Sequence, residues 1–477
     1  MGGEVMGVST TYVTCMMPFS YHERSKYKLY DALKEQGYTF FTLDNLQLQK
    51  AFYGDICVLH EEMDQYFLPY IERRIFPKKE KSQAFLRYSK KVEQFATLHI
   101  HQKAYQFNVL SVDIIACPFQ VGFISFRIEL KGDYTFDEVV DFMHHIRILE
   151  PKMPDETGIQ IRRNDQVFKS VSEYMLNDLC AFMHDFINHD AVRGGYFGSL
   201  PFFEDERMLL AGYIEPEEAL STAELYRLSQ LDGLDEHGNP YISAENDEYM
   251  ENYLDKRMNK RFSPKIEKLI TEHVYMSIVL PHIPKKMQAI AQSRFMGTEY
   301  YQLILHYFYK LTLLKLSYLY SEVSVLHDQD YTEQLMEQID QFSASYYFQE
   351  VSSRSTGIEP ANKLQEVFKI EQQYTEAKET LESLYRNQES TSTRRQNSLL
   401  FMLTIFTVLS GIYGMNLIID EWKEPYKLSY LKSYTFFEWI SFITAIFGIG
   451  LSIAVIATSG FSKIRLQLRK RKRRRYE

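Results

Sequence analysis

Cysteine and tryptophan are scarce in this chain of 477 residues, which contains 4 of the former and 2 of the latter. The cysteines Cys15, Cys57, Cys117 and Cys180 are far apart and form no CxxC pair. We therefore expect reduced, buried thiols in a cytoplasmic domain, and no disulfide framework. The first ten residues, MGGEVMGVST, have neither a basic stretch nor an apolar run, so a signal peptide is not expected.

The sequence also lacks the common motifs of phosphate and acyl chemistry. It has no GxxxxGK[ST] loop for nucleotides and no GxSxG turn for a nucleophilic serine. Three histidine pairs have no partners at a recognised zinc spacing, so no metal role is assigned to them. These pairs are His99 with His101, His144 with His145, and His184 with His189. We expect the protein not to be an enzyme.

Charge is distributed unevenly along the chain. Residues 399–477 carry 12 lysines and arginines against 5 acids, a net charge of +7, which leaves −16 for residues 1–398 out of the total of −9. An acidic body repels the phosphates of nucleic acid and is compatible with cation binding. Divalent cations are therefore better candidates for partners than nucleic acid.

Two long apolar runs lie near the C-terminus. Residues 399–419 contain no charged residue, and a helix of this length spans a hydrocarbon core of roughly 30 Å. With a second run inside residues 435–460, the sequence predicts two transmembrane helices joined by an extracytoplasmic loop at 420–434. The earlier apolar stretch Tyr300–Leu326 is interrupted by Lys310, Lys315 and Glu322, and predicts a buried soluble helix.

The flanking charges predict an orientation for these helices. Arg394 and Arg395 precede the first run, and residues 461–477 form a strongly basic tail after the second. The positive-inside rule then places both termini in the cytoplasm of a multi-pass protein of the cell membrane. Because the tail directly follows an apolar run, its expected partner is the anionic headgroups of membrane lipids.

Residues 1–260 predict a mixed α+β, or α/β-like, cytoplasmic domain. Phe107–Ile114 and Val121–Leu130 are rich in strand-forming residues, whereas Phe136–Ile146 and Val171–Asn188 have the periodicity of amphipathic helices. Residues 261–359 predict a helical cytoplasmic segment.

Residues 360–398 predict a long stalk helix that continues into the first apolar run. No glycine or proline occurs between Ala361 and Ser410, so nothing interrupts the helical pattern. An apolar seam recurs at spacings of three and four, and must be buried against neighbouring helices or copies of the chain. Its members are Leu364, Val367, Ile370, Tyr374, Ala377, Leu381 and Leu384.

The first apolar run contains the tripeptide Gly414-Met415-Asn416, with Tyr413 before it. At this place, after a long helix and before a last apolar run with a basic tail, the tripeptide resembles the signature of the CorA family of magnesium transporters. The resemblance covers residues 360–477. It implies a passive channel for Mg²⁺, with Co²⁺, Ni²⁺, Zn²⁺ or Mn²⁺ as other permeant ions, formed by a homopentamer with Gly414, Met415 and Asn416 as selectivity filter. The loop at 420–434 departs from the family, because it lacks Met-Pro-Glu-Leu and is long.

The chemistry of these residues agrees with ion passage. A ring of neutral Asn416 amides can hydrogen-bond the water shell of Mg²⁺ without holding the ion too tightly. A stripe at spacings of three and four predicts the pore lining, with Leu400 as a hydrophobic constriction. This stripe consists of Thr407, Thr404, Leu400, Asn397 and Thr393.

The same residues are also compatible with a purely structural role. Gly414 and Asn416 are typical of helix C-terminal caps, and threonines in apolar helices often bond to their own backbone. The alternative function is a non-conducting, membrane-anchored sensor or scaffold with the same architecture.

A second candidate site is an acidic face at residues 330–340. Asp330, Glu333, Glu337 and Asp340 follow each other at steps of three, four and three, and so share one side of a helix. A solvated surface explains them most simply. The functional hypothesis is that they bind regulatory Mg²⁺ between subunits and stabilise the closed state.

Overall fold

The structure is a computed structural model. It describes residues 6–49, 51–80, 83–151, 156–187, 207–235, 237–321, 329–416, 435–437, 439–440, 442–443 and 446–447. Its internal contacts divide the chain into two compact units. Unit 1 comprises Met1–Val323 and Glu333–Leu381, and unit 2 comprises Ser324–Thr332 and Glu382–Glu477.

Unit 1 is built on a mixed sheet, which has 12 strands within the described residues. The strand order is β10-β11-β12-β9-β1-β5-β4-β3-β7-β8, with β2 paired to β3 and β6 paired to β1. Neighbours are antiparallel except β9 and β12, which are parallel. The strands are β1 Gly7–Ser20, β2 Thr39–Phe40, β3 Leu86–Ile100, β4 Lys103–Ala116, β5 Val121–Leu130, β6 Tyr134–Thr135, β7 Gln160–Arg163, β8 Gln166–Phe168, β9 Leu209–Pro216, β10 Met258–Phe262, β11 Ile266–Ile270 and β12 Val274–Val279.

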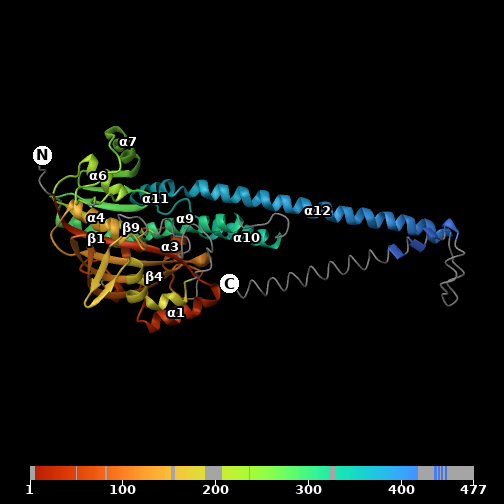
Figure 1. The fold of residues 1–477 in the computed structure, drawn as a ribbon, viewed down its shortest axis with the longest axis horizontal. Coiled ribbons are helices and arrows are strands. Elements are labelled where there is room, and N and C mark those ends of the chain that lie inside the picture. Colours follow the sequence, from red (N-terminus) through yellow and green to blue (C-terminus); the bar gives the residue numbers. More distant parts are fainter. Residues whose placement is uncertain are drawn as a thin grey trace. The chain divides into compact units, whose positions relative to one another are not determined.

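Helices pack on both faces of this sheet (Figure 1). Helices α6 and α7 lie at one end of the unit and α1 at the other. The α-helices are α1 Lys26–Glu35, α2 His60–Asp64, α3 Pro69–Ile75, α4 Phe136–Ile146, α5 Val171–Tyr174, α6 Thr222–Gln230, α7 Asp247–Arg257, α8 Lys285–Arg294, α9 Tyr300–Ser321, α10 Gln329–Ser345, α11 Ser355–Val367 and α12 Ile370–Asn416. Two π-helical turns are η5 Met175–Leu179 and η7 Phe295–Glu299, and η6 Ala181–Asp185 is a 3-10 turn.

The two faces of the central strands differ in polarity because side chains alternate across a strand. One face of β4 and β5 presents Val112, Ile114, Ile124 and Phe126 to a large apolar core. Helix α4 covers that face, and its Phe142 ring lies 5.7 Å from the ring of Phe107. The opposite face is unusually polar and is covered by α9.

Several predicted elements are confirmed. The strand at Val121–Leu130 and the helix at Phe136–Ile146 have the predicted bounds. Helix α4 begins sharply because Thr135 and Glu138 form a capping box. The single helix predicted at Val171–Asn188 is wrong: α5 continues directly into η5, and a bend at Cys180 separates both from η6.

The sheet does not end at residue 260. Strand β10 crosses that position, and β11 and β12 follow it. The segment 261–359, which the sequence predicts to be helical, therefore begins with two strands before α8. Strand β12 joins the sheet beside β9, so its apolar residues belong to the same core as β1 and β9.

Helix α9, Tyr300–Ser321, confirms a buried helix in the stretch predicted at Tyr300–Leu326. Every side chain from Tyr300 to Leu313 is buried, which explains why the helix is apolar all round. Polar groups inside it bond to nearby backbone. Gln302 donates to the carbonyl of Gly357 at 2.6 Å, and His306 Nδ1 lies 2.7 Å from the carbonyl of Gln302.

Burial of His306 predicts acid sensitivity. Desolvation lowers the pKa of His306 from 6.5 to about 4. Below pH 6.5 the unfolded chain therefore binds a proton that the folded chain rejects, so stability is complete above pH 6.5 and falls by about 3 kcal/mol as the pH drops toward 4. Urea unfolding at several pH values measures this effect: the free energy of unfolding should decrease less below pH 6.5 for His306→Leu than for the wild type. The control variant His101→Asn, at an exposed turn, should keep the wild-type dependence of unfolding free energy on pH. The same dependence in all three proteins would contradict the assignment of acid sensitivity to His306.

The predicted stalk at 360–398 is not one helix. Helix α11 ends at Val367, and α12 begins at Ile370. Between them Lys369 has a left-handed backbone with φ of 53°, so the chain turns and both Phe368 and Ile370 become buried. No glycine marks this break, and for that reason the sequence pattern does not predict it.

The apolar seam of the stalk is buried within unit 1. Leu364, Val367, Ile370, Ala377 and Leu381 are each at most 2% exposed. Helix α10 and the residues that follow it pack against this seam. The hydroxyl of Tyr374 donates to Ser343 at 2.8 Å, and the rings of Tyr374 and Tyr347 are 4.9 Å apart. Up to Leu381, other parts of the same chain therefore bury the seam, and no second copy is needed for this.

Among the residues that the structure describes, none of the helices has both the length and the apolar character needed to cross a membrane. This finding contradicts the predicted two-helix transmembrane domain, with spans at 399–419 and 435–460, and the multi-pass location in the cell membrane that was based on it. Of the predicted span 399–419, the described helix α12 covers residues 399–416, which measure about 27 Å, against a hydrocarbon core of roughly 30 Å. The loop at 420–434 and the basic tail at 461–477 lie outside the described residues.

Candidate functional site

The predicted pore-lining residues all lie on α12. Since α12 is helical from Ile370 to Asn416, spacings of three and four place them on one face. Each of these side chains is exposed in the single chain: Thr393, Asn397, Leu400, Thr404 and Thr407. The helix thus brings the whole predicted stripe together in unit 2.

The two threonines of the apolar section bond to their own helix. Thr404 Oγ1 donates to the carbonyl of Leu400 at 2.8 Å, and Thr407 Oγ1 donates to the carbonyl of Leu403 at the same distance. The structural role considered for these threonines, back-bonding to the helix, is therefore present in the structure. The side chains of the predicted filter, Met415 and Asn416, lie outside the described residues, although the backbone of Gly414 to Asn416 is helical.

Apolar side chains surround this stripe on α12. Phe401 is 67% exposed, Leu403 51% and Val408 55%. Phe406 packs on Phe447 with ring centroids 5.6 Å apart, so the described part of the second apolar run contacts the first within unit 2. Apolar side chains exposed on several sides of a helix indicate that further apolar surface packs against it.

The predicted regulatory acids lie on α10. Glu333, Glu337 and Asp340 are exposed, and the side chain of Asp330 lies outside the described residues. In the part of the chain that the structure describes, no group of three or more histidine, cysteine or acidic side chains is placed to hold a metal ion. Glu333, Glu337 and Asp340 thus lie on the exposed side of α10.

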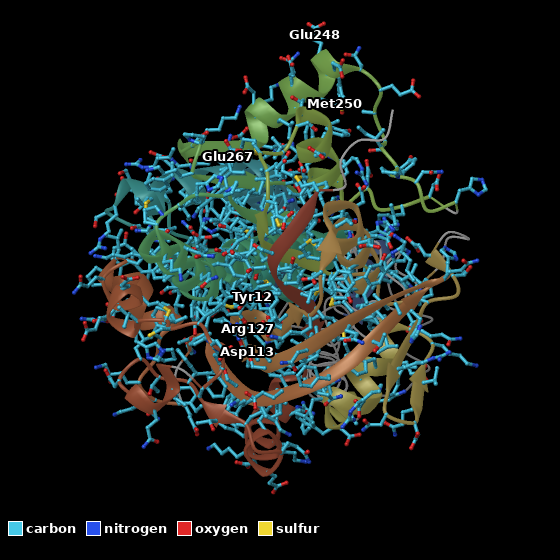
Figure 2. All side chains as sticks on the ribbon, turned by 90° about the vertical axis from the view of Figure 1, so that its left-hand side faces the viewer. Tyr12, Asp113, Arg127, Glu248, Met250 and Glu267 are labelled. Atoms are coloured by element: carbon cyan, nitrogen blue, oxygen red, sulfur yellow. The ribbon has the colours of Figure 1, made fainter. Side chains whose placement is uncertain are left out.

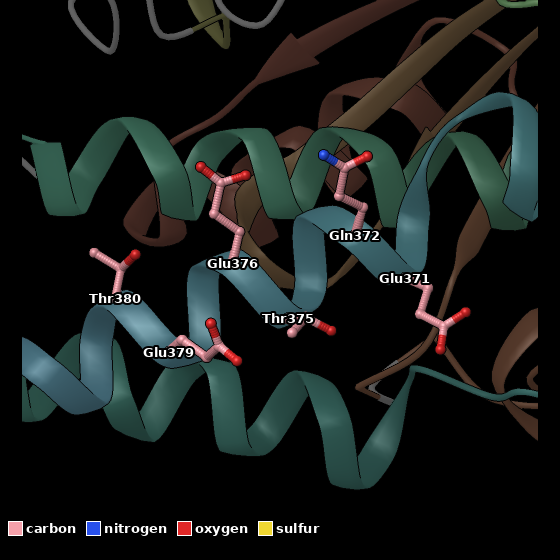
Figure 3. A pocket seen from close by; sticks show the side chains of 6 residues that line it. All are labelled: Glu371, Gln372, Thr375, Glu376, Glu379 and Thr380. Carbon is pink, nitrogen blue, oxygen red and sulfur yellow. The ribbon is translucent and has the colours of Figure 1, made fainter.

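A shallow groove of about 540 Å³ runs along the first turns of α12. Its lining is acidic and hydroxylic: Glu371, Gln372, Thr375, Glu376, Glu379 and Thr380. Figure 3 shows that the three carboxylates point in different directions along the helix, with Glu376 directed away from Glu379. The groove therefore presents negative charge to solvent without forming a convergent metal site.

A buried charge cluster, which was not predicted from the sequence, lies on the polar face of the sheet. Strand register brings Asp113 on β4 opposite Ser89 on β3 and Ser125 on β5. The carboxylate of Asp113 accepts hydrogen bonds from four side chains of unit 1. These donors are Arg87 at 3.2 Å, Ser89 at 2.6 Å, Tyr300 at 2.8 Å and Arg127 at short range.

The members of this cluster are almost fully removed from solvent. Arg87 is 2% exposed, and Asp113 and Arg127 are 0% exposed. Figure 2 shows Asp113 and Arg127 side by side inside the unit, whereas Glu248 lies at its rim. Burial opposes ionisation of Asp113, but Arg127 and then Arg87 outweigh it and hold the pKa of this carboxyl below its usual range.

Aromatic rings complete the surroundings of the two arginines. The guanidinium of Arg127 lies 4.3 Å from the ring centroid of Tyr300, and that of Arg87 lies 4.0 Å from the ring of Phe41. Such stacking compensates part of the desolvation of a cation. Two of the Arg127 nitrogens, Nε and Nη2, have no hydrogen-bond partner among the described residues.

The end of the π-turn η7 and the start of α9 place three consecutive residues on this polar face. Glu299 pairs with Lys268 on β11, Tyr300 donates to Asp113, and the hydroxyl of Tyr301 accepts from Arg87 at 2.7 Å. Each contact reaches a different strand, so the start of α9 is fixed to the sheet by polar bonds. Among the described residues, no cavity opens on Asp113. The role of the cluster is therefore structural: its hydrogen bonds hold the start of α9 against the sheet.

Comparison of the chain with models of known protein families gave no match, and comparison with curated proteins gave none.

Proposed function

We propose that this chain is a subunit of a passive divalent-cation channel whose main ion is Mg²⁺. The observation that carries the proposal is the continuity of α12. One helix of 47 residues connects the acidic body with Gly414-Met415-Asn416 and holds the polar stripe on a single face. The choice of Mg²⁺ as the transported ion is based on the resemblance of this motif to the CorA signature.

The composition of the chain supports the same function. Residues 1–398 carry a net charge of −16, and such a field raises the local concentration of cations. A narrow polar stripe flanked by exposed apolar side chains is suited to an axis shared by several copies, since one helix cannot enclose a water-filled path. The proposed assembly is a homo-oligomer, with five subunits as the family resemblance implies. Ions would move down their own gradient.

A second candidate is a non-conducting sensor or scaffold. The hydrogen bonds of Thr404 and Thr407 to backbone carbonyls of α12 favour it, because they explain the two hydroxyls without a pore. Flux separates the two functions. Purified full-length protein in liposomes loaded with a Mg²⁺ indicator should admit Mg²⁺ without ATP, and an indicator signal equal to that of protein-free liposomes would favour the sensor or scaffold.

Regulation by the acids on α10 is part of the proposal. If internal Mg²⁺ bridges Glu333 and Glu337 to another subunit in the closed state, Glu333→Gln with Glu337→Gln should raise the Mg²⁺ concentration for half inhibition about fivefold or more. The control pair Glu248→Gln with Glu251→Gln removes two exposed acids from α7 and should leave the midpoint alone. An unshifted midpoint in the α10 pair would remove these acids from regulation.

A further inference from the structure

The buried cluster around Asp113 carries more positive than negative charge. Within the described residues, the ion pairs of Arg87 and Arg127 are both with this one carboxylate, so two guanidinium groups share a single negative charge. All three side chains are at most 2% exposed. A buried charge without a counter-charge is costly, because it has lost its hydration and gained no partner. One positive charge of the cluster therefore remains to be balanced.

The tyrosines that contact the two arginines do not supply the missing negative charge. Tyr300 lies against Arg127, and Tyr301 accepts a hydrogen bond from Arg87. Burial raises the pKa of both tyrosine hydroxyls above the usual value of 10, so they remain protonated at neutral pH. An aromatic ring attracts a cation through its negative face, but more weakly than a full negative charge in contact does. The balancing group therefore has to come from outside these side chains.

The unused hydrogen-bond donors of Arg127 lie together on one edge of its guanidinium. Nη1 donates to Asp113 and to Ser111, whereas Nε and Nη2 have no hydrogen-bond partner among the described residues. In a planar guanidinium the Nε–H bond runs parallel to one N–H bond of Nη2, and such a pair of donors can hold an anion with two hydrogen bonds. A single anion beside this edge would satisfy both nitrogens and neutralise the cluster.

We propose that Arg127 binds one chloride ion, which becomes enclosed beneath the start of α9 as unit 1 folds. A site around a side chain that is 0% exposed favours a single atom over the several oxygen atoms of a phosphate or carboxylate. Neutrality of the cluster requires one negative charge, and a halide carries one. Arg127 belongs to unit 1 and the predicted pore-lining residues to unit 2, so this site does not depend on the proposed function.

Urea unfolding of the full-length protein tests the chloride site. Sodium chloride is exchanged for sodium gluconate at constant ionic strength, so that only the anion changes, and circular dichroism of tyrosine in the near ultraviolet follows unfolding. Chloride that binds only the folded chain stabilises it. Each tenfold rise in chloride concentration above the dissociation constant should therefore lower the equilibrium constant of unfolding about tenfold.

Two substitutions separate this site from other effects of the anion. Arg127→Met leaves one arginine paired with Asp113, so the dependence of stability on chloride should disappear. The control Arg162→Met removes an exposed arginine of β7 and should keep the wild-type dependence. A chloride dependence that persists in Arg127→Met would overturn the site, and so would equal stability of the wild type in chloride and gluconate.

Crystals of the wild type decide the question if Arg127→Met does not fold. Full-length protein crystallised from sodium bromide should give an anomalous scattering peak within hydrogen-bond distance of both Nε and Nη2 of Arg127. A water molecule at this position, without an anomalous signal, would overturn the proposal and show that buried solvent satisfies the two nitrogens.

Discussion

Asp113→Asn is expected to cost about 3–5 kcal/mol of folding stability, a large part of the 5–15 kcal/mol typical of a folded protein. The substitution keeps the size of the side chain and removes the one negative charge that Arg87 and Arg127 share. Both guanidinium groups are at most 2% exposed, so neither can recover its hydration without unfolding. The expected penalty comes from this uncompensated charge more than from a lost hydrogen bond.

Unfolding in urea, followed by circular dichroism of the full chain, measures this effect. Tyrosine signals in the near ultraviolet come mainly from unit 1, which contains 28 of the 35 tyrosines, whereas both tryptophans, Trp422 and Trp439, belong to unit 2. Asp133→Asn at an exposed position should leave the midpoint unchanged. A midpoint for Asp113→Asn equal to that of Asp133→Asn would show that the cluster does not stabilise the fold.

Removing all three charges tests the reason for the penalty. The triple variant Arg87→Met, Asp113→Leu and Arg127→Met should lose less stability than Asp113→Asn alone, because no buried charge is left without a partner. The pH range also distinguishes this cluster from His306. The pKa of Asp113 is lowered, so its contribution is complete above the unfolded value of about 3.9 and disappears only in stronger acid.

Asn416→Ala is expected to abolish Mg²⁺ influx while the oligomer still assembles. In the proposed channel the Asn416 amide oxygen is the acceptor nearest the end of α12, and alanine offers nothing to the water shell of the ion. Asn416→Asp keeps an acceptor but adds charge, so it should hold Mg²⁺ longer and slow its release.

Liposome flux and gel filtration together measure this prediction. The matched variant Asn362→Ala changes an exposed asparagine of α11 and should conduct like the wild type. Wild-type influx rates in Asn416→Ala would remove the selectivity role from this residue, whereas loss of influx accompanied by loss of the oligomer would assign Asn416 to assembly instead.

Local patterns predicted local structure well in this chain. The helix Phe136–Ile146 has a capping box at its start, and the strand Val121–Leu130 is rich in strand-forming residues, so both could be recognised without tertiary information. The seam from Leu364 to Leu381 was also recognisable, because spacings of three and four are a property of the helix itself. The break at Lys369 was not, since tertiary burial of Phe368 decides it.

The charge cluster was missed because its members are distant in sequence. Asp113 and Arg127 meet only through the register of β4 and β5, which no local pattern fixes. A signal did exist: Asp113 is the one charge in the apolar stretch SVDIIA, and Arg127 is the one charge in ISFRI. A charge in a strand of that kind requires an opposite charge on a neighbouring strand, and a search for such pairs would have joined these two residues.

The burial of α9 has a consequence for hydrogen exchange. Its amides from Tyr300 to Leu313 are enclosed by the sheet on one side and by other helices of unit 1 elsewhere. Such amides exchange with heavy water only when the whole unit opens, whereas those of the exposed helix α7 exchange through local fraying. The slowest amides of α9 therefore measure the global free energy of unfolding of unit 1 under native conditions, without denaturant.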